Sequence, residues 1–265
     1  MQSDIKHVWV ITAHAESEFL EDCICSILNQ TVKSKIIMCT ATDNGHIRSL
    51  AEKYSIELYI KNGRDIVRDN WNYAYNMADG DWVTLAHQDD IYQPNYVEEL
   101  NRKVKNIKNA SIFFSDYRPF GNYGKGAMRN KKIEKTICFP LRIPLFAKSR
   151  FFKCFILALG NAICCPTVSF HKAFLGRDLF AHADKNNINA NLDWEMWIYL
   201  AKKKNAFVYS PKELLKYRLH ENQETATYME NKTRISEDAR CFELIWPKFI
   251  VRFLMKFYKK AYDIY

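Results

Sequence analysis

Asp-Trp-Val-Thr-Leu-Ala-His-Gln-Asp-Asp-Ile-Tyr occupies residues 81–92. Its apolar first half is typical of a buried strand, and two adjacent carboxylates, Asp89 and Asp90, follow it. Ligands bind at strand ends in open α/β sheets, and carboxylate oxygens are the ligands that Mg²⁺ or Mn²⁺ prefers. The pair therefore predicts a site for a metal ion and a phosphate. A second interpretation stays open, in which Asp90 caps a helix over residues 94–104 that has Pro94 just inside its start.

Strands and helices alternate over the first hundred residues. Such alternation predicts right-handed β-α-β units and a parallel sheet with helices on both faces, so we expect an α/β protein. The hydrophobic patterns predict strands at 8–12, 36–39, 57–60 and 82–86, and helices at 16–28, 47–54 and 69–77.

The composition of the 265 residues is that of a globular protein, with 48% apolar and 26% charged residues. A net charge of +9 favours an anionic partner such as a nucleotide, a lipid phosphate or an acidic membrane. The sequence has no helix-turn-helix, zinc or aromatic RNP pattern, so we expect no nucleic-acid partner.

The eight cysteines show no C-x-x-C spacing and are expected to be free thiols in a reducing cytosol. Residues 2–6 lead directly into a predicted strand, without a signal peptide. The longest apolar stretch, residues 151–170, is interrupted by Lys153 and Pro166 and does not suit a membrane span. We therefore expect a cytoplasmic protein.

Residues 121–127, Gly-Asn-Tyr-Gly-Lys-Gly-Ala, resemble a phosphate-binding loop, but no Gly-Lys-Ser/Thr occurs. We predict a flexible, positively charged loop that continues into the basic segment 129–135.

The C-terminal residues 246–265 carry cations at intervals of four among many aromatic residues. This pattern predicts a basic amphipathic helix on an anionic membrane surface, with residues 140–155 on the same side. A helix packed on the domain or on a second subunit stays an equal alternative. The cations are Lys248, Arg252, Lys256 and Lys260.

Four segments in chain order resemble glycosyltransferase family 2. They are residues 11–31, opening with Ile11-Thr-Ala-His-Ala-Glu and ending in Ser-Ile-Leu-Asn-Gln-Thr; residues 72–83, Asn72-Tyr-Ala-Tyr-Asn-Met-Ala-Asp-Gly-Asp-Trp-Val, followed by Asp89-Asp90; residues 191–201, Asn191-Leu-Asp-Trp-Glu-Met-Trp-Ile-Tyr-Leu-Ala; and residues 217–225, Tyr217-Arg-Leu-His-Glu-Asn-Gln-Glu-Thr.

This resemblance implies a GT-A fold, a Rossmann-like and mostly parallel central sheet flanked by helices. It implies a GT-A domain over residues 1–225, with a nucleotide-binding half over about 1–105 and an acceptor-binding half over 106–225. Residues 226–265 are then a C-terminal helical, basic-amphipathic extension.

The resemblance also assigns roles to single residues. Asp90 and His220 are the implied metal ligands, and Asp89 is expected to contact the nucleotide ribose or the metal's water shell. Asp193 is the candidate general base, which takes the proton of the acceptor hydroxyl while that oxygen attacks the anomeric carbon with inversion. The alternative for Asp193 is the N-cap of a helix over residues 194–203.

Further candidates surround these residues. Trp194 and Trp197, one helical turn apart, are expected in the core, and Trp194 is the one to face an acceptor if either does. The other residues expected to bind the nucleotide sugar are Ala13, His14, Glu16, Thr40, Asp43 and Arg68.

Three positions depart from the family pattern. Leu192 stands where the family usually has Glu, and His87 stands where the family has its first acidic residue near the metal pair. Residues 39–44 read Cys-Thr-Ala-Thr-Asp-Asn where the family often has Asp-Asp-Gly-Ser, which leaves the nucleotide open.

The predicted function is an inverting, Mn²⁺- or Mg²⁺-dependent transfer of a sugar from a nucleotide diphosphate, with a UDP-sugar expected first. The acceptor is a hydroxyl of a glycan or lipid-linked molecule, in bacterial capsule or lipopolysaccharide assembly. The alternative is a non-catalytic GT-A-fold subunit that binds a sugar nucleotide or glycan. A monomer and a homo-oligomer are both compatible with the sequence.

Overall fold

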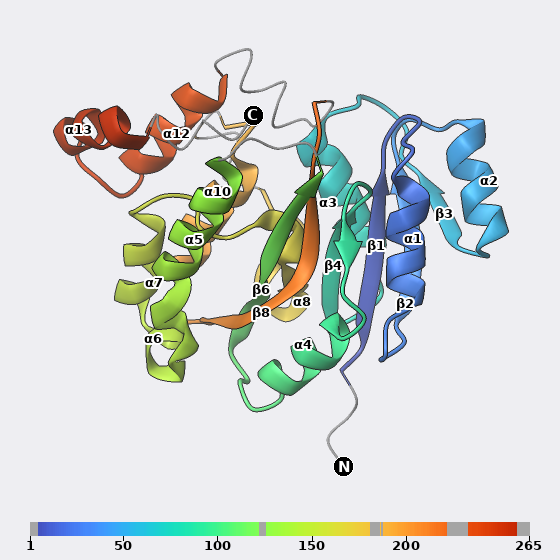
Figure 1. Cartoon of the computed structure of the whole chain (residues 1–265), viewed down its shortest axis with the longest axis horizontal. Helices are drawn as coiled ribbons and strands as arrows, with labels where there is room; N and C mark the ends of the chain where they lie inside the picture. Colours follow the sequence, from blue (N-terminus) through green and yellow to red (C-terminus); the bar gives the residue numbers. More distant parts are fainter. Residues whose placement is uncertain (1–4, 122–125, 181–185, 187, 222–232, 259–265) are drawn as a thin grey trace.

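A computed structural model describes residues 5–121, 126–180, 186, 188–221 and 233–258 (Figure 1). Its strands are β1 His7–Ala13, β2 Lys35–Thr40, β3 Glu57–Ile60, β4 Trp82–His87, β5 Ile91–Tyr92, β6 Ala110–Gly121, β7 Ser169–His171 and β8 Ala206–Leu219. Within the described ranges they form one eight-stranded sheet in the order β3-β2-β1-β4-β7-β6-β8-β5.

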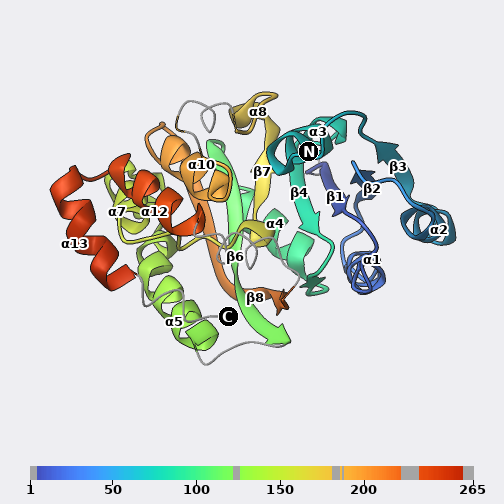
Figure 2. The same cartoon turned by 90° about the horizontal axis from the view of Figure 1, so that it is seen from above.

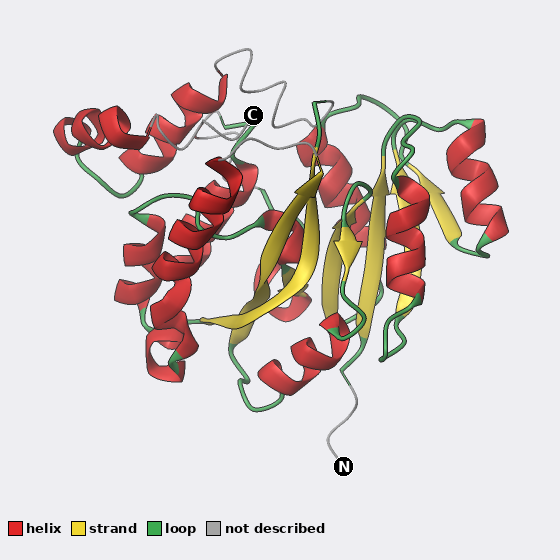
Figure 3. Cartoon of the chain, in the orientation of Figure 1, coloured by secondary structure: helices red, strands yellow, loops and turns green. Residues whose placement is uncertain are grey.

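Helices cover both faces of this sheet (Figures 1 and 3). Their bounds are α1 Leu20–Leu28, α2 Gly45–Lys53, α3 Val67–Met77, α4 Tyr96–Val104, α5 Gly126–Cys138, α6 Pro144–Lys148, α7 Arg150–Leu157, α8 Lys172–Leu175, α10 Leu192–Ala201, α12 Thr233–Glu243 and α13 Lys248–Tyr258. Short 3₁₀ helices span Phe139–Arg142 and Cys165–Thr167.

The structure confirms the mostly parallel sheet. Strands β3, β2, β1 and β4 pair in parallel, with Thr12 opposite both Cys39 and His87. Strand β6 pairs in parallel with β8, whereas β7 and β5 run antiparallel to their neighbours. The carboxyl ends of β1, β2, β4, β6 and β8 therefore lie at one edge of the sheet.

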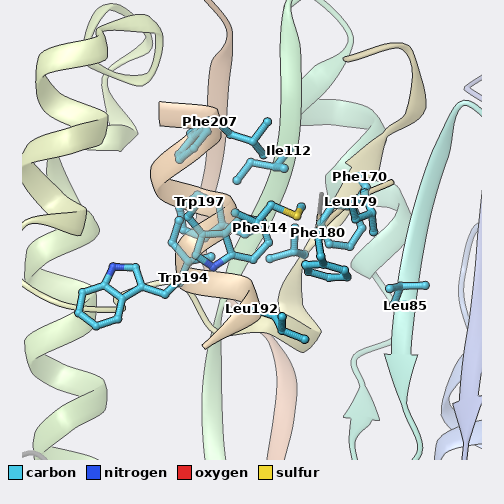
Figure 4. Close-up of a cluster of buried hydrophobic side chains, with 14 of the residues drawn as sticks. Leu85, Ile112, Phe114, Phe170, Leu179, Phe180, Leu192, Trp194, Trp197 and Phe207 are labelled. Atoms are coloured by element: carbon cyan, nitrogen blue, oxygen red, sulfur yellow. The ribbon is translucent and has the colours of Figure 1, made fainter. Parts of the chain in front are cut away.

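Side chains of β1 alternate between two cores, because successive residues of a strand point to opposite faces. Val8 and Val10 belong to the core that α3, α7 and α10 cover, and Trp9 and Ile11 belong to the core under α1, α2 and α4. Figure 2 shows α3 and α1 on opposite sides of the sheet. The first core continues into an aromatic cluster around Phe114, Phe170, Trp194, Trp197 and Phe207 (Figure 4).

The prediction that the loop continues into residues 129–135 is wrong, because residues 126–138 form helix α5. The inward side of this helix is partly polar, which conceals its period from a hydrophobic pattern. Lys131 is buried there and forms ion pairs with Asp116 and Glu213. Residues 122–125 lie outside the described part of the chain.

Within the predicted C-terminal segment, helix α13 spans Lys248–Tyr258, and residues 259–265 lie outside the described ranges. All eight cysteines are free. In the described ranges, none of the helices combines the length and the apolar character needed to cross a bilayer.

Burial of His7 makes the stability of this fold depend on pH. The ring lies within 3.0 Å of Ser34 Oγ and 2.8 Å of Thr84 Oγ1. Burial lowers the His7 pKa from 6.5 to about 3. The unfolded chain therefore binds a proton that the folded chain does not, so the stability present above pH 6.5 is lost as the pH falls toward 3.

We expect His7 to account for a loss of about 2 kcal/mol in the free energy of unfolding between pH 7 and pH 5. Urea denaturation of the wild type and of His7→Gln at both pH values measures it, and the variant should lose less stability on acidification. His46→Gln, at a half-buried histidine, is the control. An equal pH dependence in wild type and His7→Gln would contradict this prediction.

Candidate active site

Two adjoining cavities lie at the carboxyl edge of the sheet. The first has a volume of about 300 Å³ and the second about 260 Å³. They share the side chains of Val67, Trp71, His87 and Asp89. The strand-end position predicted from residues 81–92 is therefore hollow on both sides of β4.

The first cavity lies between the ends of β1 and β2 and the start of α3. Of the predicted nucleotide-sugar ligands, Ala13, His14, Thr40 and Asp89 line it. Lys61 and Asp65 from the segment after β3, and Asn70 from α3, complete its polar lining.

Hydrogen bonds hold the chain after β1 against its neighbours. The backbone N–H of His14 donates to Gln88 Oε1 and Gln88 Nε2 donates to the His14 carbonyl, both over 2.9 Å. Ala15 has a φ of +51° and donates its N–H to Thr42 Oγ1 over 2.6 Å. The first cavity is thus formed by fixed backbone.

Arg218 fixes the carboxylate pair after β4. Its Nε donates to the Asp89 carbonyl over 2.8 Å, and its backbone N–H donates to Asp90 Oδ1 over 2.9 Å. The guanidinium also pairs with Asp22 over 2.8 Å and lies over the Phe19 ring. Strand β8 and helix α1 are therefore joined through the loop that carries both carboxylates.

Asp89 faces His220, as the sequence predicted for residues of one site. The distance from Asp89 Oδ2 to His220 Nε2 is 3.3 Å, and Ser17 Oγ donates to Asp89 Oδ1 over 3.4 Å. The His220 ring also packs on Phe19, with centroids 4.9 Å apart.

Asp90 is only 1% exposed, and burial raises the pKa of its carboxyl. Its Oδ2 is buried and makes no hydrogen bond within the part of the chain that the structure describes. The capping interpretation of Asp90 is wrong, because α4 begins at Tyr96 and its N-cap is Asn95.

His87 separates the two cavities and is neutral at physiological pH, since burial lowers its pKa to about 4. Its ring packs on Trp71, with centroids 5.0 Å apart. Its Nε2 is buried and makes no hydrogen bond to any described residue. A neutral imidazole beside both carboxylates offers a polar contact without a further charge.

Asp193 lines the second cavity together with Asp89 and Asp90. Its Oδ2 accepts a hydrogen bond from Asn161 Nδ2 over 2.9 Å, and its Oδ1 accepts one from the Trp194 N–H over 2.8 Å. Helix α10 begins at Leu192 with Asn191 as its N-cap, so the capping interpretation of Asp193 is also wrong. Two carboxylates that follow β4 and one of α10 thus line one cavity.

The second cavity also contains polar side chains that sequence reasoning missed. Burial raises the Glu134 pKa to about 7, and Tyr117 OH donates to this carboxyl over 2.8 Å. Arg234 lies in the same lining; although burial lowers its pKa, the carboxylates of Asp238 and Asp193 raise it. In the sequence Glu134 falls in the segment predicted as a basic loop and Arg234 in the C-terminal extension, and neither carries a pattern that marks a site.

Other predicted residues lie elsewhere. Glu16, Asp43 and Arg68, all within the described ranges, are absent from both linings, and Asp43 pairs with Arg48 over 2.5 Å. Trp194 is fully buried between α10, α12 and α13, with its ring 4.9 Å from that of Phe242. It belongs to the core and is not available to an acceptor. Residues 222–225 of the last motif lie outside the described part.

A comparison with protein families shows which family the chain belongs to. The family model described as glycosyl transferase family 2 matches residues 8–167, which is more than half of the chain. The chain therefore belongs to glycosyl transferase family 2.

An uncharacterized glycosyltransferase of Methanocaldococcus jannaschii is 27% identical over 122 residues, 43% of this chain. The match spans 42% of the length of that relative.

Solved structures confirm the GT-A fold. A Pyrobaculum calidifontis mannosyltransferase in complex with GDP-Man and Mn²⁺ has a TM-score of 0.62 at 10% identity, covering 97% of this chain and 70% of its own. Glucosyl-3-phosphoglycerate synthase from Mycobacterium tuberculosis, in complex with Mn²⁺ and UDP-glucose, has a TM-score of 0.56 at 14% identity, covering 89% and 79%.

Proposed function

We propose that this glycosyltransferase moves a sugar from a nucleotide diphosphate to a hydroxyl of a glycan or lipid-linked acceptor, with inversion at the anomeric carbon. The observation that carries this proposal is the meeting of Asp89, Asp90 and Asp193 around the second cavity, which adjoins the first. Structures of similar fold contain UDP-glucose or GDP-Man, which supports a nucleotide-sugar donor. By resemblance to the family, we place the reaction in bacterial capsule or lipopolysaccharide assembly.

In this proposal the nucleotide lies in the first cavity and the sugar extends into the second. The segment 1–105 then binds the nucleotide, while 106–225 contributes Asp193 and the acceptor side. Asp193 accepts the proton of the acceptor hydroxyl as that oxygen bonds to the anomeric carbon and the bond to the diphosphate breaks. The hydrogen bond from Asn161 orients the carboxylate for this role.

A divalent ion would neutralise the charge of the departing diphosphate. Asp90 fits an Mn²⁺ or Mg²⁺ site, because its Oδ2 is buried and makes no hydrogen bond within the described residues. Asp89 follows as the adjacent carboxylate, and the His220 imidazole lies 3.3 Å from Asp89 Oδ2. Among the described residues, no group of three or more His, Cys, Asp or Glu side chains could hold a metal, so donor oxygens have to complete the coordination.

The first prediction from this proposal concerns Asp90. A ligand that binds the native state raises the melting temperature by mass action. Because the donor would bind together with the metal ion, one class of nucleotide sugar should stabilise the wild type only in the presence of Mn²⁺ or Mg²⁺. We expect Asp90→Asn to lose this shift. Thermal-shift assays with UDP-, GDP-, CMP- and dTDP-sugars, with metal or with EDTA, measure it. An equal shift in EDTA would contradict the role of Asp90 as a metal ligand.

The second prediction concerns Asp193. Asp193→Asn should keep the thermal shift with the donor and lower release of the nucleoside diphosphate about 10²–10⁴-fold, because a neutral amide takes no proton. Release of the diphosphate during slow donor hydrolysis gives the rate without a known acceptor. Glu195→Gln, on the same helix but outside both cavity linings, is the control. Equally fast release by Asp193→Asn would contradict the role of Asp193 as the base, whereas a wild type that binds the donor but releases no diphosphate would favour a non-catalytic, sugar-nucleotide-binding subunit.

We also propose that α6, α7 and α13 rest on an anionic membrane surface. Their exposed apolar side chains are large, with Leu145, Phe151 and Phe249 each more than 70% exposed. Lys248, Arg252 and Lys256 are exposed along α13 beside the stripe formed by Phe249, Phe253 and Phe257. A basic stripe beside a broad apolar one is typical of a helix that lies in the membrane interface.

Replacing Phe249 and Phe253 together with Ser should weaken vesicle binding more than about tenfold, since a buried Phe contributes about 1.5–3 kcal/mol. Cosedimentation with vesicles of equal parts phosphatidylglycerol and phosphatidylcholine measures this change. Phe174→Ser, at an exposed aromatic of α8, is the control. Binding that survives in the double variant would leave α13 as a purely structural helix.

A further inference from the structure

A third hollow, the apolar pocket, lies between α5, α13 and the segment after α7. It has a volume of about 430 Å³, within the range of small-molecule sites. Most of its lining is hydrocarbon, contributed by Ile133, Ile137, Leu159, Ala162, Phe242, Leu254 and Phe257. The large side chains of Ile133, Leu159 and Phe257 are at the same time exposed on the surface. The pocket therefore opens between the apolar side chains of the proposed membrane face.

The apolar pocket meets the second cavity. Asn130, Glu134 and Asn161 line both hollows. Asn161 donates to Asp193 over 2.9 Å, so the boundary between the two hollows is the residue that orients the candidate base. A molecule that fills the apolar pocket and passes Asn161 brings its polar end to the catalytic carboxylates.

The wall that α13 contributes is tightly seated. Gly160 has a φ of +143°, and a Cβ at this position would lie 2.9 Å from Tyr258 Cε2. Glycine therefore permits the close approach of Tyr258, while Val251 on the same helix is buried in the core. The pocket is thus bounded on one side by the close packing of α13 against residue 160.

Both helices that form the pocket carry exposed positive charge. Arg129 of α5 is exposed and lines it directly. On α13, the exposed cations Arg252 and Lys256 each precede one of the exposed phenylalanines, Phe253 and Phe257. An apolar chamber with cations at its rim is complementary to a hydrocarbon chain that carries an anionic group.

We propose that the apolar pocket holds the hydrocarbon chain of a phosphate-linked lipid acceptor, whose head group enters the second cavity past Asn161. This inference rests on the proposed transfer reaction and narrows its acceptor to the lipid-linked class. The membrane face then delivers the acceptor from the bilayer directly into the pocket, and the hydroxyl to be glycosylated lies on the side of Asp193.

The test is isothermal titration calorimetry, in which decyl phosphate below its critical micelle concentration is titrated into the full chain. Phe257→Asp and Ile133→Asp should each weaken binding about tenfold or more, because each places a charge in the apolar lining. Phe249→Asp is the matched control, since it lies two turns from Phe257 on the same exposed stripe but outside the pocket lining. Its affinity should stay within about twofold of wild type. Inorganic phosphate should not bind measurably, and the neutral decyl maltoside should bind more weakly than decyl phosphate.

Several outcomes would overturn the inference. Equal losses in Phe257→Asp and Phe249→Asp would mean that the chain adheres to the outside of α13. No binding of decyl phosphate to the wild type, or a dimer that Phe257→Asp dissociates, would assign the pocket to another occupant. The donor thermal shift, measured on the same variants, keeps the two proposals apart. A donor shift without lipid binding overturns the lipid pocket alone, whereas lipid binding sensitive to Phe257→Asp without any donor shift overturns the transferase alone.

Discussion

The arrangement of the site depends on how Arg218 holds the carboxylate pair. Two adjacent acids at the end of β4 repel each other, and burial further raises the pKa of Asp90. The backbone N–H of Arg218 and its guanidinium offset this cost through hydrogen bonds to Asp90 and to the Asp89 carbonyl. Because Arg218 stands at the end of β8, which pairs with β6 along its length, the two halves of the chain meet at the carboxylates.

In the second half of the domain, hydrogen bonds and ion pairs made by lysine ammonium groups allow these groups to be buried. Lys153 is fully buried, and its ammonium donates to the carbonyl oxygens of Lys203 and Asn205. Burial lowers its pKa to about 8, so the charged form is less favoured than in water. The hydrogen bonds hold the ammonium group in a fixed position. On α5, Lys131 is also buried and forms ion pairs with Asp116 and Glu213. These contacts tie α5 and α7, the helices beside the apolar pocket, to the sheet.

The first hundred residues could be predicted from the sequence because each strand is followed directly by its own covering helix. Apolar periods alone located the strands at residues 57–60 and 82–86 to within one residue. The second half could not, because β6 pairs with β8 nearly a hundred residues later, with Ala110 opposite Ala206. Helix α5 was missed since its buried side carries Lys131 and Asn130.

The candidate site divides in the same way. Asp89 and Asp90 could be found because they directly follow a strand, and Asp193 through the resemblance. Glu134, Asn161 and Arg234 come from segments whose approach to the cavity depends on the packing of distant helices, and no local pattern marks them.

Asn161 connects the outer helices to the candidate base at the sheet edge. Its amide nitrogen donates to Asp193, and its backbone is hydrogen-bonded to Tyr258 of α13. Its side-chain oxygen is buried and makes no hydrogen bond to a described residue. A group that enters from the apolar pocket can therefore donate a hydrogen bond to Asn161 while it approaches Asp193.

Because Tyr258 packs α13 closely against Gly160, one short segment, residues 160–161, connects the position of the outer helix to the orientation of the candidate base. The proposed contact of α13 with a membrane would thereby be coupled, through two adjacent residues, to the orientation of the candidate base.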